Sequence, residues 1–270
     1  MKTIRSAILE KSELRLVEMG KQIVGLVFSP EGKPLLKIEG TIADEVWQQL
    51  HDQFGMSNPK YFGYDGAIAR FLKFYKSGFE SKNFICDERD YKVSAKEKLD
   101  STVPLEAALS GKGHGEAVLS AFRSTNLLYP VEKTRLQELL RGKSADDFIT
   151  AAAQLCVGDT RPALNRLDEL LRPFDNAKWT VVTYLPFLWK PHQHMFLKPE
   201  VTKDFAVRVG HSFSGIYEAK LNADVYESLL SMVVRTRAEL SELNPRDNID
   251  IQSFIWVIGA YKEGSEPQKL

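Results

Sequence analysis

The sequence predicts an α+β fold dominated by helices, in which a small N-terminal antiparallel β-meander packs on a multi-helix body. Two observations lead to this prediction. Residues 13–38 contain β-rich runs that are separated by glycine and proline turns. From Asp65 onward, apolar residues recur at helical spacing in almost every segment. Strands grouped at one end of a chain and helices at the other are typical of α+β architecture.

The first elements are three predicted strands. They read LRLVEMG, QIVGLVF and PLLKIEG, and the turns between them hold Gly20-Lys21 and residues 29–32. Thr41 is expected to cap the next segment, IADEVWQQLHDQF, which has the apolar spacing of an amphipathic helix. We therefore expect residues 1–56 to form the meander and one helix.

Residues 57–262 are predicted to form the helical body. Pro162 falls in the first turn of one predicted helix, where its missing N–H costs least, and Asp146 and Asp147 fall in the first turn of another, where acidic side chains suit the helix dipole. No linker or internal repeat separates these segments, so we expect a single compact domain over residues 1–270 with a frayed tail at 263–270. The expected helices cover residues 65–76, 84–99, 104–110, 115–124, 130–141, 145–156, 161–172, 199–209, 222–243 and 248–261.

Composition sets limits on the function. The chain is 43% hydrophobic and 27% charged, as in an ordinary globular protein. Lys+Arg and Asp+Glu both number 36, so a nucleic-acid surface must be a local basic patch. The longest apolar run, FIWVIGA at 254–260, is too short for a membrane span, and the N-terminus, MKTIRSAILEKSEL, has charges throughout and no apolar run of signal-peptide length. We therefore expect a cytoplasmic protein without a membrane partner, in which Cys86 and Cys156 are free thiols.

Several enzyme classes are excluded by missing motifs. The chain has no G-x-S-x-G, H-E-x-x-H, paired CxxC or dinucleotide-binding glycine fingerprint. The glycine-rich run at 111–115 lacks the spacing of a phosphate-binding loop and reads as a connection between helices. His192 and His194 alternate as metal ligands sometimes do, but no third His or Cys lies at ligand spacing. The sequence predicts neither a metal nor a cofactor.

The strongest functional signal is the stretch from Tyr61 to Lys98, where aromatic and basic side chains alternate. In the predicted helix from Asp65, Phe74 lies between Arg70 and Lys73 on the face opposite the core. A stacking or wedge residue flanked by phosphate contacts has this pattern. The alternative is that Phe74 packs under a neighbouring loop while the two cations are simply solvated.

The loop before that helix, YFGYDG, places Tyr61 and Tyr64 around a glycine, where their rings could hold a planar base. The alternative is a turn that fixes the start of the helix, with Asp65 as its N-cap. A second basic segment lies between Pro191 and Pro199, and it gives Lys190, His192 and Lys198 as candidate contacts to an anionic ligand, with a plain surface turn as the alternative.

Two carboxylates are candidate acid/base residues. Glu88 lies on an apolar helical stripe close to Arg89 and Lys92, so it either pairs with a cation or has a raised pKa that suits proton transfer. Asp250 lies at the start of a helix that is apolar on nearly all sides, where the dipole stabilises an anion. The alternatives are a buried ion pair for Glu88 and simple helix capping for Asp250 or its neighbour Asp247.

These features together favour a DNA-acting enzyme that extracts a base, most simply one of the DNA glycosylase type. Cleavage of an N-glycosidic bond requires a carboxylate, aromatic faces for the flipped base and cations for the backbone. The alternative is a non-catalytic module that binds nucleic acid or protein through the same surface, and a small-molecule enzyme that uses His114 or His192 is a third possibility. The roles expected are acid/base for Asp250 or Glu88, stacking for Tyr61, Tyr64 and Phe74, and phosphate contact for Arg70, Lys73, Arg89 and Lys92.

Overall fold

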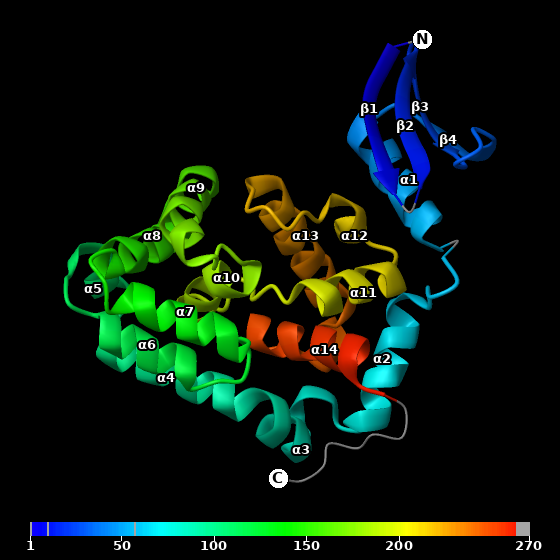
Figure 1. Ribbon diagram of the computed structural model, residues 1–270. Coiled ribbons are helices and arrows are strands. Elements are labelled where there is room, and N and C mark those ends of the chain that lie inside the picture. The colour runs from blue at the N-terminus through cyan, green and yellow to red at the C-terminus, as the bar shows by residue number, and fades with distance from the viewer. Residues whose placement is uncertain (1, 10, 57, 263–270) are drawn as a thin grey trace. The chain divides into compact units, whose positions relative to one another are not determined.

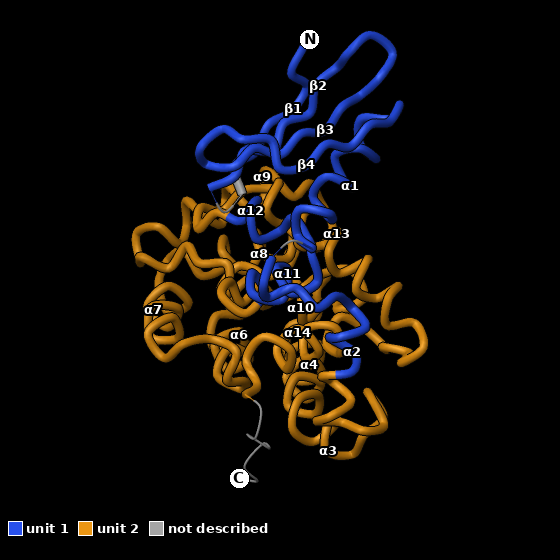
Figure 2. The backbone as a smooth tube through the Cα atoms, turned by 90° about the vertical axis from the view of Figure 1, so that its right-hand side faces the viewer, with its two compact units in different colours: residues 1–69, 202–217 blue, residues 70–201, 218–270 orange. Residues whose placement is uncertain are grey.

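The computed structural model describes residues 2–9, 11–56 and 58–262, and it confirms the predicted α+β fold with a helical majority (Figure 1). The predicted frayed tail at 263–270 lies outside these described residues. By its internal contacts the chain divides into two compact units (Figure 2). Unit 1 comprises residues 1–69 and 202–217, and unit 2 comprises residues 70–201 and 218–270. The single-domain organisation expected from the sequence stays a prediction.

Unit 1 contains a four-stranded antiparallel sheet in the order β1-β2-β3-β4, which confirms the predicted meander. The helix α1 (Ala43–Met56) covers one face of this sheet, and Val46 and Leu50 pack on Leu14, Leu16, Val27 and Ile38. A Cβ atom on Gly40 would lie 2.6 Å from Cγ2 of Val46, so the glycine lets α1 approach closely. The strands are β1 (Lys2–Leu9), β2 (Ser12–Met19), β3 (Gln22–Phe28) and β4 (Pro34–Gly40).

The sequence did not predict β1. This strand lies at the edge of the sheet, pairs only with β2 in the register Lys2↔Glu18 to Leu9↔Ser12, and exposes most of its described side chains. An edge strand with one neighbour and little burial needs no regular apolar alternation, so KTIRSAIL carries little pattern to detect.

The rest of unit 1 comes from two distant segments, the first turns of α2 (Gly63–Phe74) and most of α11 (Pro199–Val209) with α12 (Phe213–Ile216). The N–H of Phe62 donates to the carbonyl of Arg208 over 3.0 Å. The ring of Tyr64 meets that of Phe205 edge-on, with centroids 6.2 Å apart. These contacts join residues more than a hundred positions apart.

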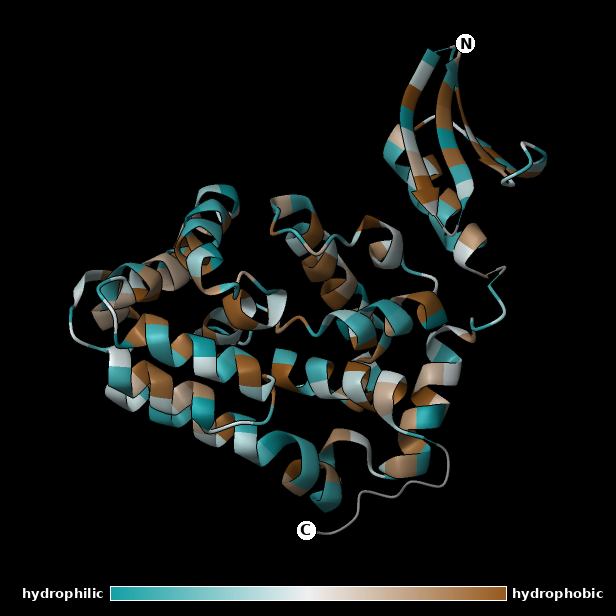
Figure 3. Ribbon diagram, in the orientation of Figure 1, coloured by the Kyte–Doolittle hydropathy of each residue, from teal (hydrophilic) through white to brown (hydrophobic). Residues whose placement is uncertain are grey.

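Unit 2 is helical, and it contains helices close to the predicted positions 104–110, 115–124, 130–141, 145–156, 161–172, 222–243 and 248–261. Figure 3 shows hydrophobic and hydrophilic residues mixed along its helices, the pattern of amphipathic helices around a core. No helix among the described residues is long and apolar enough to cross a membrane. Its main helices are α4 (Asp90–Thr102), α5 (Leu105–Ser110), α6 (Gly115–Arg123), α7 (Pro130–Leu140), α8 (Ala145–Val157), α9 (Thr160–Leu171), α10 (Trp179–Trp189), α13 (Ala223–Glu239) and α14 (Asn248–Ala260).

Two features of unit 2 differ from the sequence prediction. The helix expected at 84–99 is split into α3 (Lys82–Phe84), a π-helical turn at Ile85–Arg89, and α4, and the N–H of Asp90 reaches back five residues to the carbonyl of Ile85. The helix α10 was not expected from the sequence, and Pro186 and the β-branched residues within it disfavour a helix locally. Every residue of α10 is buried, so tertiary packing outweighs its weak local preference.

Candidate functional site

Unit 2 contains a small hollow beside the π-helical turn, which we call the Glu88 hollow. Its volume is about 90 Å³. Four parts of the chain form its wall: the π turn with α4, the connection between α6 and α7, the residue before α11, and α14. The lining residues are Asp87, Glu88, Tyr91, Asn126, Leu127, Lys198, Gln252 and Trp256.

The carboxylate of Glu88 is held by two donors. Its side chain lies in the π-helical turn and the residue is only 5% exposed. The phenol of Tyr261 donates to Oε1 over 2.7 Å, and the ammonium of Lys92 donates to Oε2 over 3.3 Å. Turns of π-helix occur frequently at functional sites. Glu88 is thus a buried carboxylate that is fixed in place and that also borders an open space.

Lys92 lies behind the carboxylate, wholly buried. Its ammonium donates to Oγ of Ser253 over 2.7 Å in addition to its contact with Glu88. Burial lowers the pKa of Lys92 to about 8, and the charge of Glu88 opposes this shift. Glu88 and Lys92 thus form the buried ion pair that was the alternative to an acid/base role for Glu88. Glu88 also lines the hollow.

Three tyrosines lie near Glu88, and one of them, Tyr261, donates to its carboxylate. The hydroxyls of Tyr75 and Tyr261 lie 3.1 Å apart, and Tyr91 lines the hollow. Burial is the main cause that raises the pKa of all three phenols, and the negative charge of Glu88 adds to the rise. The phenols therefore stay protonated at neutral pH and can donate to an anion.

The other lining residues of the hollow include an amide, an indole and a cation. Gln252 is 4% exposed, and its Oε1 has no hydrogen-bond partner within the described part of the chain. The ammonium of Lys198 lies 5.3 Å from the ring centroid of Trp256 and donates to the carbonyl of Leu127 over 3.2 Å. Partial burial raises the pKa of the nearby Asp87 carboxyl. A ligand in this space meets acceptor, donor and aromatic groups together.

Asp250 occupies a different environment. It is fully buried, and it pairs with Arg89 over 2.9 Å and with Arg246 over 2.9 Å. Arg89 also binds both carboxylate oxygens of Asp247, which accepts from the N–H groups of Ile249 and Asp250 and so caps α14. Asp250 does not line the Glu88 hollow. Its two arginine partners account for its burial without a catalytic role.

The predicted stacking residues are mostly packed. In unit 1, Tyr64 is buried against Phe205, and Tyr61 is half-buried, its ring beside Gly63 and Gly210. In unit 2, the ring of Phe74 meets Tyr261 edge-on, with centroids 5.1 Å apart. The position of Phe74 matches the packing alternative given for it. The helix α2 begins at Gly63, so Asp65 lies in its first turn and is not the N-cap expected in the alternative for the YFGYDG loop.

The predicted cations are spread more widely. The guanidinium of Arg70 lies 5.8 Å from the ring centroid of Phe74 and donates to the carbonyl of Tyr261. Lys73 and His192 are exposed, and Lys190 is half-buried. Arg89 and Lys92 are engaged in the ion pairs described above. Among the residues predicted to form the site, the structure brings Glu88 and Lys198 together at the hollow.

Sequence reasoning missed Asp87, Asn126 and Trp256. Gln252 and Trp256 stand four residues apart on α14 and share one face, which is a detectable helical signal. Asn126 lies in a connection between helices, and no local pattern marks it. Among the described residues, no group of three or more His, Cys, Asp or Glu side chains lies in an arrangement that could hold a metal ion.

Comparison of the chain with protein-family models, with curated proteins and with solved structures finds no significant match. The functional argument therefore depends on the chemistry of the Glu88 hollow.

Proposed function

We propose that the chain is a DNA-acting hydrolase of the DNA glycosylase type, in which Glu88 supports cleavage of the N-glycosidic bond. The observation that carries this proposal is a buried carboxylate, held by Tyr261 and Lys92, that borders a hollow lined by Trp256, Gln252 and Lys198. The proposal implies nucleic acid as the partner and the cytoplasm as the location.

Each wall of the hollow supplies a group that this reaction uses. Glycosidic cleavage develops positive charge on the sugar, and a nearby carboxylate stabilises that charge and orients the attacking water. In this scheme Glu88 faces the sugar, and the unpartnered Oε1 of Gln252 accepts a hydrogen bond from the water. The water oxygen bonds to the anomeric carbon as the bond to the base breaks, and the base departs with a proton.

The aromatic wall suits an extruded base. The indole of Trp256, with Lys198 over its ring, offers a stacking face with a cation beside it. The hollow measures about 90 Å³, which is less than the roughly 150 Å³ of a cavity that accommodates benzene. Entry of a base therefore requires side chains to move, and the long, flexible side chain of Lys198 permits such movement.

The test is incubation of the protein with duplexes that carry normal and modified bases, followed by alkali to cut abasic positions. We expect the wild type to produce strand scission on at least one duplex and Glu88→Gln to produce none while it stays folded and keeps its duplex affinity. Glu97→Gln, which changes an exposed glutamate on α4, is the matched control and should retain the activity. Absence of scission by the wild type on every duplex, or an unchanged rate in Glu88→Gln, contradicts the proposal.

A non-catalytic binding module is the second candidate. The internal ion pairs of Arg89, Lys92 and Asp250 favour it, because these groups are already neutralised within the fold. In that case duplexes or partner proteins bind to the wild type and to Glu88→Gln alike, and neither protein gives an abasic product. The same set of variants therefore separates the two candidates.

A further inference from the structure

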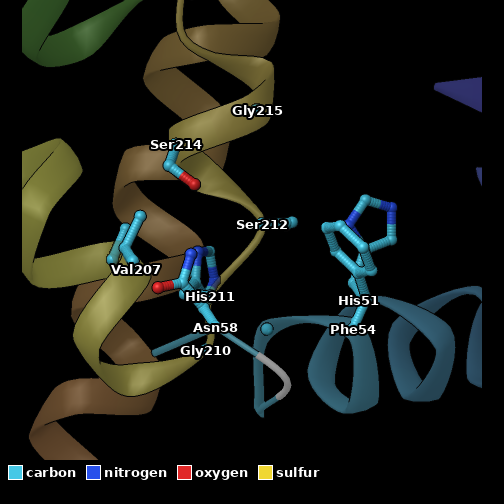
Figure 4. A pocket seen from close by; sticks show the side chains of 11 residues that line it. His51, Phe54, Asn58, Val207, Gly210, His211, Ser212, Ser214 and Gly215 are labelled. Carbon is cyan, nitrogen blue, oxygen red and sulfur yellow. The ribbon is translucent and has the colours of Figure 1, made fainter. Parts of the chain in front are cut away.

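Unit 1 contains a second cavity, which we call the His51 cavity. Its volume is about 140 Å³. Figure 4 shows His51 and Phe54 of α1 on one side and Val207, His211 and Ser214 on the other side. All residues that line it belong to unit 1, whereas the Glu88 hollow belongs to unit 2. An inference about the His51 cavity is therefore independent of the proposed hydrolase activity.

Two glycines build the floor of this cavity. A Cβ atom on Gly55 would lie 2.7 Å from Cα of Gly210, so the end of α1 and the turn after α11 meet backbone to backbone. Gly210 has a φ of +71°, a conformation that other residues rarely adopt. Backbone contact of this kind fixes the separation of the two walls.

His51 is the unusual group in its wall. The residue is 4% exposed, and neither ring nitrogen has a hydrogen-bond partner within the described part of the chain. Burial lowers the pKa of His51 to about 4, so the ring is neutral at pH 7 and carries one N–H donor and one acceptor nitrogen. Leaving both groups buried without partners costs free energy. A ligand that brings its own acceptor and donor removes this cost.

The other lining groups indicate what kind of ligand fits. No Asp, Glu, Lys or Arg is among them, so a charged ligand would lose its hydration without gaining a counterion. The ring of Phe54 and the side chain of Val207 supply apolar surface, and His211 and Ser214 supply polar groups. Nδ1 of His211 accepts from the N–H of Phe213 over 3.1 Å, so its Nε2 carries the ring hydrogen. The volume allows one small ring system.

We propose that the His51 cavity binds a small, neutral nitrogen heterocycle that carries both a hydrogen-bond donor and an acceptor, the chemistry of a free nucleobase. In this complex the ring lies against Phe54, and its polar edge pairs with the imidazole of His51.

The experiment measures binding of uracil, cytosine and adenine to the full chain by isothermal titration and by saturation-transfer NMR. Benzene and benzoate serve as probes of similar size that lack the paired donor and acceptor, and benzoate also carries a charge. We expect at least one base to bind, with an affinity about tenfold or more above that of either control probe.

Variants then test whether the bound ligand lies in the His51 cavity. His51→Phe removes both ring nitrogens and Ser214→Leu fills the opposite wall, so each should weaken the binding of that base by about tenfold or more. His51→Gln keeps a neutral donor and acceptor and should retain part of the affinity. Partial binding by this variant would show that the loss in His51→Phe does not come from a general loss of structure. Trp47→Phe alters a residue that contacts the His51 ring without lining the cavity, and it should bind as the wild type does. Failure of all three bases to bind, binding of benzene equal to that of the bases, or unchanged affinity in both His51→Phe and Ser214→Leu overturns the proposal.

Discussion

Tyr261 donates a hydrogen bond of 2.7 Å to the carboxylate of Glu88, which lies 173 residues earlier in the chain. This bond joins the residue that follows α14 to the π-helical turn before α4. A second phenol, Tyr75, lies 3.1 Å from the hydroxyl of Tyr261 and extends the network toward α2. The candidate carboxylate is therefore positioned by three segments that are distant in sequence, and its environment arises only after unit 2 has folded.

Asp250→Asn should destabilise the protein strongly. The substitution removes the charge that pairs with Arg89 and Arg246, and removal of one partner of a buried ion pair typically costs about 3–5 kcal/mol. Urea denaturation followed by circular dichroism measures the change. Asp224→Asn, in a pair with Arg161 whose side chains are both mostly exposed, should cost less than about 1 kcal/mol. Equal losses in the two variants would show that the buried pair has no special role.

Lys92→Met should also destabilise the protein, by about 3 kcal/mol, because it leaves the carboxylate of Glu88 buried with Tyr261 as its remaining partner. The double variant Lys92→Met with Glu88→Gln removes both charges and should recover part of the loss. A double-mutant cycle on the free energy of unfolding measures the coupling. Losses that simply add would mean that the two side chains do not stabilise each other.

Because His51 is buried and has a lowered pKa, the free energy of unfolding should depend on pH. Burial lowers the pKa of His51 from 6.5 to about 4, with the charge of Asp52 opposing the shift. Between these values the unfolded chain binds a proton that the folded chain does not, so this contribution to stability is present above pH 6.5 and is lost as the pH falls toward 4. At about 1.4 kcal/mol per pKa unit the total is about 3 kcal/mol.

The measurement compares the wild type with His51→Gln, since glutamine does not titrate. The free energy of unfolding of the wild type should fall more steeply than that of His51→Gln between about pH 7 and pH 4.5, by about 2–3 kcal/mol. Carboxylates titrate in both proteins, so their contribution cancels in the difference. Parallel pH profiles would show that His51 is not protected from protonation.

Much of the fold follows from local sequence patterns. The alternation in β2 and β3, the turn residues between strands and the helical spacing after Asp65 each predicted the element that the structure contains. The exceptions are elements that are stabilised by tertiary packing or by pairing with another strand and not by their own sequence pattern. The helix α10 contains Pro186 and is held by complete burial, and the edge strand β1 is held by pairing with β2.

The candidate site was less predictable for a related reason. Glu88 stood out because a carboxylate on an apolar stripe is a local pattern. Its donor Tyr261 and its neighbours Trp256 and Asn126 come from other segments, and only the tertiary structure brings them to one place. Asp250 was also marked by a local pattern. Arg246 lies four residues before it, but nothing near Asp250 in the sequence indicated that the distant Arg89 would pair with it as well.

The two cysteines should react at very different rates with iodoacetamide. Cys86 is exposed, whereas Cys156 is buried and burial raises the pKa of its thiol to about 12. Because the thiolate is the reactive form, the native protein should be alkylated at Cys86 alone, as read by peptide mass spectrometry. Both cysteines should react in urea, and Cys86→Ser should abolish labelling of the native protein. The reagent cannot reach the Cys156 thiol while α8 is packed in unit 2. Comparable labelling of Cys156 under native conditions would therefore mean that α8 unfolds locally on the time scale of the reaction.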